Sequence, residues 1–264
     1  MTKQKGYVTP ETLAEIEKIT HTIKLASYAA MGIAKGQNVL DVGCGSGADT
    51  FRMAKLISHP NQSSMAYGVD FDPDMINAAI KRSTDGGRGF NTNHVVASAY
   101  CLPYDDQMFD GVRSERMLQH LERPYDAFDE MVRVTKEGGR VVVIDTDWNT
   151  LSINTPYAYW EQVLKNHIIN SYVQNPFSGR MLYGMANAHP DLKRVVVTSH
   201  AINITDLGVL YAALNLLDME EKIVRDGVFN EEQIALWREG LIGMSKTRDL
   251  FTTITFNMVS GTRI

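Results

Sequence analysis

Short apolar runs recur through the first 150 residues of the chain, separated by segments with helical periodicity. Five of these runs predict buried strands, at Asn38–Val42, Ala66–Asp70, His94–Ala97, Gly111–Ser114 and Arg140–Asp145. Capping residues, first-turn prolines and closing glycines mark the helices between them. Four helical segments are predicted, over Thr9–Gly36, Asp49–Ser58, Asp72–Asp85 and Pro124–Lys136. Strands that alternate with helices indicate a parallel sheet with helices on both faces.

The pattern changes after Trp148, where longer helical segments separate the remaining strands. Helices are predicted near Tyr157–Tyr172, Arg180–Ala188, Asp206–Arg225 and Glu231–Thr247, and strands at Arg194–Asn203 and Phe251–Val259. The chain shows no internal repeat, low-complexity segment or clear linker. One domain that carries insertions is therefore expected, rather than two independent domains.

Composition and charge exclude several classes of protein. Apolar residues make up 44% and charged residues 22% of the 264 positions, as in globular proteins. No run of 18 apolar residues occurs and the opening segment is polar, so we expect no membrane span, no secretory signal and a cytoplasmic location. The net charge of −5 and the lack of a basic block argue against a nucleic acid partner. Two cysteines without metal-ligand spacing support neither a disulfide framework nor a structural metal.

The most informative segment is VLDVGCGSG, in which the first predicted strand runs directly into glycines before a helix. Glycines at this point let the backbone bend sharply and let a ligand lie against it, as in nucleotide-binding sites. Gly43, Gly45 and Ala48 also fit the dinucleotide pattern G-x-G-x-x-A, which by itself is weak evidence.

Two aspartates help to distinguish the ligands that such a loop binds. Asp41 stands two residues before Gly43, where a carboxylate repels a pyrophosphate but attracts an ammonium group. Asp70 ends the second predicted strand, and its two oxygens match the two hydroxyls of a ribose. The aspartates therefore favour an adenosine ligand that carries a positive charge.

Further motifs follow in a fixed order: YGVDFDPDMI, LPYDDQMFD, RMLQHL and EGGRVVV. With the glycine loop, they make the chain resemble the class I S-adenosylmethionine-dependent methyltransferases over roughly Gly36 to Trp148. The likeness is greatest to the ubiquinone/menaquinone C-methyltransferases and to natural-product methyltransferases. It implies a Rossmann-like α/β fold with a seven-stranded, mostly parallel sheet, an antiparallel last strand and an inserted helical lid.

The resemblance also implies an activity and a set of cofactor contacts. The cofactor is S-adenosyl-L-methionine, which becomes S-adenosyl-L-homocysteine when its methyl group moves to a small-molecule acceptor, secondary-metabolite or quinone-like, by in-line displacement. Asp41 and the glycine loop hold the methionyl part, Asp70 the ribose, and Phe71 flanks the adenine. Where the family often has Gly-Asp-Ala, this chain has Ala97-Ser98-Ala99, and Ser98 is assigned the adenine amino group. The full set of expected cofactor residues is Asp41, Gly43, Gly45, Gly47, Asp70, Phe71, Ser98, Ala99 and Ser114.

Acceptor contacts are expected from the elements that surround this common core. The candidates are Tyr7, Glu115, Trp148, Trp160, Arg180 and Tyr183, and the candidates for a general base, if one is needed, are His167 and His200. No metal is expected. In this interpretation the single domain 1–264 has an N-terminal helical cap (1–35), a cofactor-binding core (36–148), and helical insertions (149–192 and 204–250) that form the acceptor lid.

Two other functions stay open at this point. The chain could be an NAD-dependent oxidoreductase, because the glycine loop alone fits both cofactors. It could also be a catalytically silent protein that keeps S-adenosylmethionine as a structural or regulatory ligand. The sequence leaves the oligomeric state open and is compatible with a homodimer.

Overall fold

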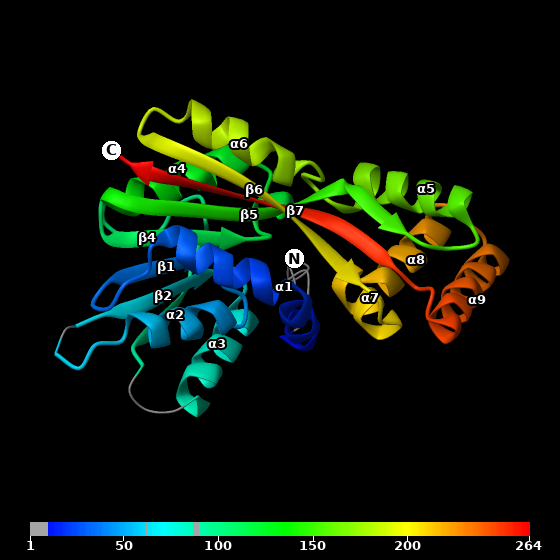
Figure 1. Ribbon diagram of the computed structural model, residues 1–264, viewed down its shortest axis with the longest axis horizontal. Helices are drawn as coiled ribbons and strands as arrows, with labels where there is room; N and C mark the ends of the chain where they lie inside the picture. Colours follow the sequence, from blue (N-terminus) through cyan, green and yellow to red (C-terminus); the bar gives the residue numbers. More distant parts are fainter. Residues whose placement is uncertain (1–9, 62, 87–89) are drawn as a thin grey trace.

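The chain forms one seven-stranded sheet with the strand order β3-β2-β1-β4-β5-β7-β6 (Figure 1). The structure is a computed structural model that describes residues 10–61, 63–86 and 90–264. The strands are β1 (Asn38–Val42), β2 (Met65–Asp70), β3 (Thr92–Val96), β4 (Phe109–Glu115), β5 (Thr135–Ile153), β6 (Leu192–Ile204) and β7 (Thr252–Arg263). Strands β1 to β5 pair in parallel, whereas β7 lies antiparallel between β5 and β6. The predicted fold class is confirmed.

Helices cover both faces of this sheet. They are α1 (Pro10–Met31), α2 (Ala48–Ile57), α3 (Pro73–Asp85), α4 (Pro124–Val134), α5 (Ala158–His167), α6 (Ser178–Ala188), α7 (Leu207–Leu214), α8 (Leu216–Arg225) and α9 (Glu231–Thr247), with short turns η1 (Leu118–His120) and η2 (Ile168–Tyr172). Successive residues of β5 divide between two apolar clusters, because side chains alternate across a strand. Val142 and Ile144 pack with α1 and α2, whereas Val141 and Val143 pack with α4 and α6.

Several predicted element boundaries are wrong, including the end of the last strand, which reaches Arg263 instead of Val259. The fourth helix was expected to reach Lys136 and end at Gly138-Gly139, but α4 ends at Val134 and the glycines lie within β5. Pairing with β4 ends at Ile144, and pairing with β7 alone carries β5 on to Ile153, well past the predicted end at Asp145. The helix predicted over Asp206–Arg225 is two helices, because Asn215 adopts a left-handed conformation (φ 50°) between α7 and α8.

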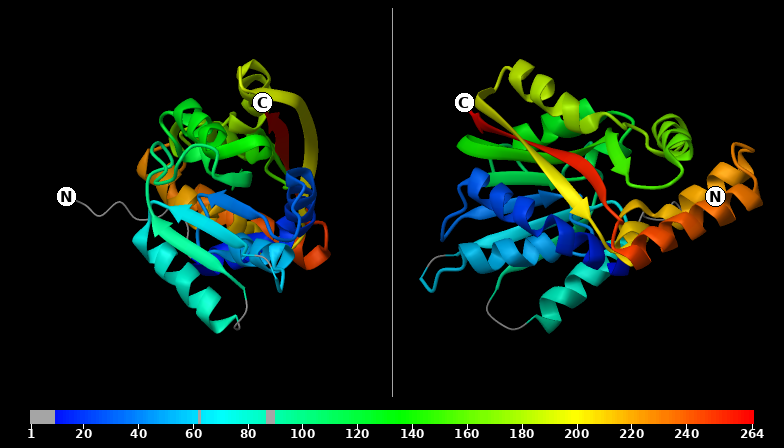
Figure 2. Two further views of the ribbon diagram at one scale, coloured as in Figure 1. Left: turned by 90° about the vertical axis from the view of Figure 1, so that its left-hand side faces the viewer. Right: turned by 45° about the vertical axis from the view of Figure 1, so that its right-hand side comes forward.

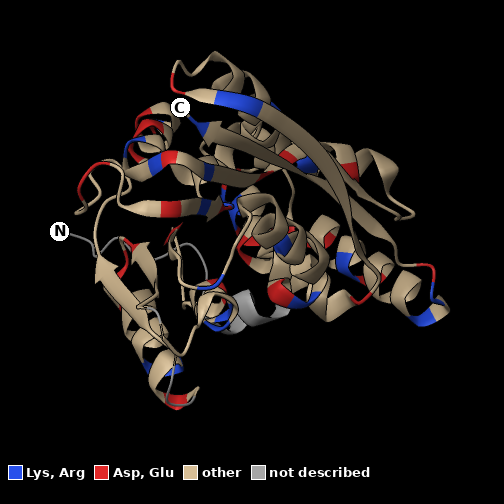
Figure 3. Cartoon of the chain, turned by 60° about the vertical axis from the view of Figure 1, so that its left-hand side comes forward, with Lys and Arg blue, Asp and Glu red and all other residues tan. Residues whose placement is uncertain are grey.

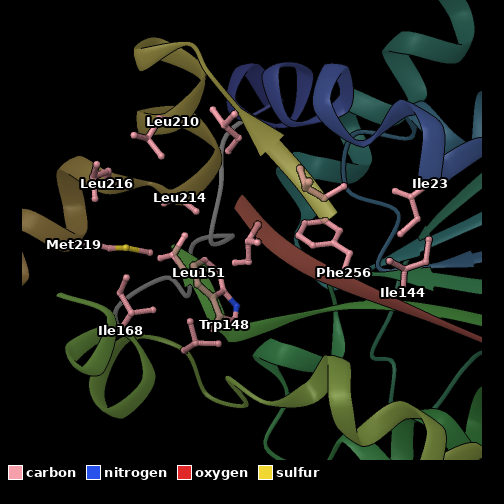
Figure 4. Close-up of a cluster of buried hydrophobic side chains, with 14 of the residues drawn as sticks. Ile23, Ile144, Trp148, Leu151, Ile168, Leu210, Leu214, Leu216, Met219 and Phe256 are labelled. Atoms are coloured by element: carbon pink, nitrogen blue, oxygen red, sulfur yellow. The ribbon is translucent and has the colours of Figure 1, made fainter. Parts of the chain in front are cut away.

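The long strands carry the sheet into a helical lobe made of α5, η2, α7, α8 and α9 (Figure 2). One buried apolar cluster joins the two parts (Figure 4). It runs from Ile23 of α1 and Ile144 of β5, through Phe256 of β7 and Trp148, to Leu210 and other residues of the lobe. The lobe therefore shares its core with the sheet instead of forming a core of its own.

Acidic and basic residues are interspersed over the elements rather than separated onto different sides (Figure 3). Among the described residues, no helix has the length and apolar character needed to cross a membrane. In the same part of the chain, no group of three or more His, Cys, Asp or Glu side chains is placed to hold a metal ion.

Candidate active site

A cavity of about 630 Å³ lies at the carboxyl ends of the central strands. Asp41 and Val42 of β1, Val69 and Asp70 of β2, and the end of β4 all line it. This is where open parallel sheets bind their ligands, because the loops that leave neighbouring strands diverge there.

The glycine loop forms one wall of the cavity and is tied to β2 by its backbone. The N–H groups of Gly43 and Cys44 both donate to the carbonyl oxygen of Val69, at 2.7 and 2.9 Å. Gly43 has a φ of 75°, and a Cβ there would lie 3.0 Å from the Met117 side chain. A residue larger than glycine would therefore need both a strained backbone and a displaced neighbour.

Asp70 is held by the loops on either side of it. Its Oδ2 accepts a hydrogen bond from the Gly45 N–H at 2.8 Å, and its Oδ1 accepts one from the Asp72 N–H at 3.0 Å. Burial raises the pKa of Asp70, although these backbone donors favour the ionised form. Each oxygen keeps further acceptor capacity, so the carboxylate can still bind a pair of hydroxyl groups.

Gly47 has a different role, because it packs against other elements and does not line the cavity. A Cβ at Gly47 would lie 2.7 Å from the Cβ of Ala79 and 2.9 Å from Nε2 of His94, and its φ is 73°. We therefore expect Gly47→Ala to lower the free energy of unfolding by roughly 2–5 kcal/mol, which combines backbone strain with overpacking. Chemical denaturation measures this loss.

The matched control is Gly227→Ala, since Gly227 has a similar φ of 72° but no atom within 4 Å of its Cβ position. The free energy of unfolding of this variant should fall only by the cost of backbone strain, about 1–2 kcal/mol. Equal losses in the two variants would show that the close contacts around Gly47 do not matter.

A buried network of charged side chains lies under the cavity. The Arg113 guanidinium contacts Asp41 at 3.2 Å, Asp49 at 3.3 Å and Glu115 at 2.6 Å. Lys24 of α1 contacts Glu115 at 2.8 Å and also pairs with Asp49. Arg52 of α2 lies 3.9 Å from Asp49, so three carboxylates are paired with three cations, and α1 is fastened to β4 and α2.

Two carboxyl groups of this network, those of Asp41 and Asp49, have pKa values shifted in opposite directions. Burial raises the pKa of Asp41 to about 7, and the nearby Asp49 adds to this, against the pull of Arg113. Burial also acts to raise the pKa of Asp49, but Lys24 and Arg113 together outweigh it and hold that pKa below its ordinary value. Asp41 is therefore the carboxylate on which an added positive charge would have the largest effect.

The charge of the whole cavity decides between the two cofactors considered for the glycine loop. Among the described residues, seven carboxylate side chains and three Lys or Arg side chains line it. Beside the glycine loop the carboxylates of Asp41, Asp70 and Asp72 disfavour a diphosphate and favour a ligand with ammonium and sulfonium groups. The residues present therefore fit S-adenosylmethionine better than a nicotinamide dinucleotide.

The end of the cavity beyond β4 is lined by Arg116, Met117, His120, Leu121 and Gln174. Trp148 Nε1 donates to Gln119 Oε1 at 2.9 Å, which turns the Gln119 amide nitrogen toward His120 Nε2 at 3.0 Å. Nε2 must accept this hydrogen bond, so the neutral ring carries its proton on Nδ1. Burial and the nearby Arg116 lower the pKa of His120 to about 4, so the ring is uncharged at neutral pH.

Most of the predicted cofactor residues meet in this cavity. Those that line it are Asp41, Gly43, Gly45, Asp70, Phe71, Ser98 and Ala99. The hydroxyl of Ser98 accepts a hydrogen bond from the Tyr100 N–H at 3.2 Å, which fixes the turn around it. Gly47 and Ser114 are not among the lining residues, and Ser114 is buried within β4.

The predicted acceptor residues are mostly placed elsewhere. Glu115 lines the cavity, and Tyr7 lies outside the described residues. Trp148 is buried in the core, Trp160 stacks on Tyr157 with ring centroids 4.5 Å apart, and Tyr183 is exposed. Arg180 is held by two hydrogen bonds to Asp147, at 2.7 and 2.8 Å.

Neither histidine considered as a general base is among the described residues that line the cavity. His167 is buried at the end of α5 beside Asp226, at 3.3 Å, and His200 lies on β6 beside Thr198. The inserted segments contribute Gln174 to the described lining.

Sequence reasoning missed Lys24, Asp49 and Arg113, which line the cavity. The available signal was an arginine in the apolar strand that neighbours Asp41, because a buried charge needs a buried partner.

Comparison with known proteins is consistent with this site. A sequence profile described as a methyltransferase domain matches residues 33–187, more than half of the chain. The ubiquinone/menaquinone biosynthesis C-methyltransferase UbiE of Serratia proteamaculans is 30% identical over 162 residues, which cover 61% of this chain and 63% of UbiE. An uncharacterised 37.1 kDa protein from a Streptomyces fradiae transposon is 29% identical over 182 residues, covering 67% of this chain and 51% of that protein.

The fold has relatives among solved structures. The YcgJ protein of Bacillus subtilis superposes with a TM-score of 0.62 at 16% identity, over 94% of this chain and 98% of YcgJ. The curated relatives named above are matched over only about half to two thirds of their own lengths. The profile match nevertheless shows that the chain belongs to the class I methyltransferase family, whose cofactor is S-adenosylmethionine.

Proposed function

We propose that this chain transfers the methyl group of S-adenosylmethionine to a small organic acceptor that binds beside the glycine loop. The observation that carries this proposal is the single cavity that joins the two ends of the site. One end contains the glycine loop and Asp70, and the other contains Met117, His120 and Leu121. Its volume of about 630 Å³ lies within the usual range for small-molecule sites, roughly 300–1,000 Å³.

Neighbouring strands of the sheet provide the contacts for different parts of the cofactor. Asp70 at the end of β2 binds the ribose hydroxyls, and the exposed ring of Phe71 flanks the adenine. The loop from Gly43 to Gly45 and the carboxylate of Asp41 hold the amino acid part. The charge excess in the cavity and the raised pKa of Asp41 support this arrangement.

The bound cofactor supplies an electrophilic methyl group on a sulfonium, and the chemistry of its leaving group is its own. The residues of the chain position the reactants, exclude water and keep the acceptor in line. Orientation of this kind can lower a barrier by roughly 7–11 kcal/mol. Nε2 of His120 already accepts a hydrogen bond from Gln119, so the proposed mechanism assigns it no proton transfer.

An extract assay with methyl-labelled S-adenosylmethionine tests the proposal. Small metabolites from cells are incubated with the protein, and labelled products are identified by mass spectrometry. A labelled small molecule that requires the protein supports methyl transfer. Tight binding of S-adenosylhomocysteine without any labelled product would instead support the silent cofactor-binding protein.

The affinity for S-adenosylhomocysteine should rise with pH. Asp41 has a pKa of about 7 in the free protein, so at pH 6 it is mostly protonated. An ammonium group beside it favours the ionised form, and binding therefore releases a proton. Between pH 6 and pH 8 we expect the affinity to increase roughly tenfold, as measured by titration calorimetry.

Asp41→Asn should bind more weakly and lose most of this pH dependence. The groups that face Asp41, namely Arg113, Asp49, Lys24, Glu115 and Thr50, are retained in that variant. Asp74→Asn, a change at an exposed position on α3, is the control and should keep the slope. A slope that survives in Asp41→Asn would assign the released proton to another group.

A further inference from the structure

Arg116 differs from the other two cationic side chains that line the cavity, Lys24 and Arg113, because both of those are ion-paired. Within the described part of the chain, the Arg116 guanidinium forms no ion pair and donates no hydrogen bond. Its contact is with the ring of Phe256 on β7, 5.9 Å from the ring centroid.

The two carboxylates whose charge acts on Arg116, those of Glu115 and Asp145, already have other partners. Glu115 is bound by Arg113 and Lys24, at 2.6 and 2.8 Å. Asp145 accepts hydrogen bonds from the N–H groups of Gln119 and Thr146, at 3.0 and 2.9 Å. Burial lowers the pKa of Arg116 but an arginine stays protonated, so the cavity holds a cation whose donors are available.

The backbone of Arg116 is in a conformation that a residue with a side chain seldom adopts. Its φ is 54°, and its N–H donates to the carbonyl oxygen of Ile144 at 2.8 Å, which fixes this turn at the end of β4. Such outliers persist where the surrounding structure holds them, and they are frequent at ligand sites. The turn places the side chain of Arg116 at the cavity.

The position of Arg116 in the sheet separates it from the cofactor residues. In the proposed function, Asp70 at the end of β2 binds the ribose, and the glycine loop after β1 holds the amino acid part. Because the strand order is β2-β1-β4, the cofactor extends toward β4. Arg116 follows β4, and its guanidinium lies over Phe256 of β7, on the opposite side of the glycine loop from Asp70.

We propose that Arg116 binds an oxyanion of the methyl acceptor, so that the substrate of this site is a small molecule with a carboxylate or phosphate group. A planar guanidinium binds either group through two parallel hydrogen bonds. The inference rests on the proposed function, since it names the class of acceptor at that same site. Met117 and Leu121 line the same end of the cavity and contact the apolar part of such a molecule.

A binding experiment tests this inference separately from methyl transfer. The protein is first saturated with S-adenosylhomocysteine, and benzoate or inorganic phosphate is then added while the melting temperature is recorded. We expect at least one of these anions to raise the melting temperature of the complex saturably. Arg116→Gln should lose this shift, Arg116→Lys should keep part of it, and Arg225→Gln, at an exposed site on α8, should keep all of it.

The two probes distinguish a carboxylate from a phosphate acceptor. Absence of any saturable shift in the wild-type complex, or an equal shift in Arg116→Gln, would overturn the inference and leave the proposed function intact. Failure of S-adenosylhomocysteine to bind at all would overturn the proposed function itself.

Calorimetry tests whether Arg116 binds the carboxylate of the cofactor instead of an oxyanion of the acceptor. Arg116→Gln should bind S-adenosylhomocysteine within about twofold of wild type, since its expected partner belongs to the acceptor. A loss of tenfold or more, with unchanged binding of 5′-methylthioadenosine, which lacks the amino acid part, would assign Arg116 to the cofactor. In the extract assay, the labelled product should be retained on an anion exchanger and should fall at least tenfold with Arg116→Gln.

Discussion

Asp70→Ala is expected to lower the affinity for S-adenosylhomocysteine by about 100-fold or more. The carboxylate is the proposed partner of both ribose hydroxyls, and hydrogen bonds to a charged group contribute about 1.5–3 kcal/mol each. The change also removes the acceptor of the Gly45 N–H, so the glycine loop loses one of its ties to β2. Titration calorimetry measures the affinity directly.

Two further variants separate these effects of Asp70. Asp70→Asn keeps the shape and one acceptor oxygen, and it should retain part of the affinity. Asp74→Ala removes an exposed carboxylate four residues away and should bind as the wild type does. Unchanged affinity in Asp70→Ala would refute the assignment of this residue to the ribose.

Arg113→Met is expected to destabilise the fold by about 3–5 kcal/mol, because it removes the cation that contacts three buried carboxylates and leaves Asp41 with no ion partner among the described residues. For a chain of this length, such a loss lowers the melting temperature by roughly 6–20 °C. Arg113→Lys should recover only part of the stability, since an ammonium group cannot contact three carboxylates as the planar guanidinium does.

The pH dependence of the stability of Arg113→Met gives a second test of the role of the buried network. Its uncompensated carboxylates have raised pKa values in the folded state, so that state takes up protons as the pH falls. The deficit relative to wild type should therefore be smaller at pH 5 than at pH 8. Arg123→Met is the control, because Arg123 forms an exposed ion pair with Asp126 and should lose about 1 kcal/mol or less. Equal losses in the two variants would contradict the role given to the buried network.

The features of the site that spacing and capping patterns predict correctly are those whose residues are close together in the chain. The strand Asn38–Val42 and the glycines that follow it form a local signal, and the structure reproduces both. Asp72 and Pro73 likewise begin α3 as predicted, with the Asp72 side chain accepting from the Asp74 N–H at 2.9 Å. Capping and glycine turns depend on neighbours a few residues away, so a pattern in the sequence contains them.

The parts that were missed depend on distant pairings. Lys24 and Glu115 are 91 residues apart in the sequence, and Arg113 and Asp41 are 72 apart. No spacing pattern reports such contacts, which arise only when the sheet places β1 beside β4. His167 was considered as a base from its residue type alone, and the fold instead places it against Asp226.

The antiparallel pairing of β5 with β7 constrains how this molecule can move. It extends from Arg140 opposite Thr262 to Ile153 opposite Thr252, and so spans both the cofactor half and the helical lobe. The register of this pairing shifts between Asp147 and Ser152, but residues on both sides of the shift are paired, so rotation of one half against the other would have to break hydrogen bonds of the ladder. We therefore expect exchange of substrate and product to depend on rotamer changes and on short segments such as η1 rather than on rotation of the helical lobe.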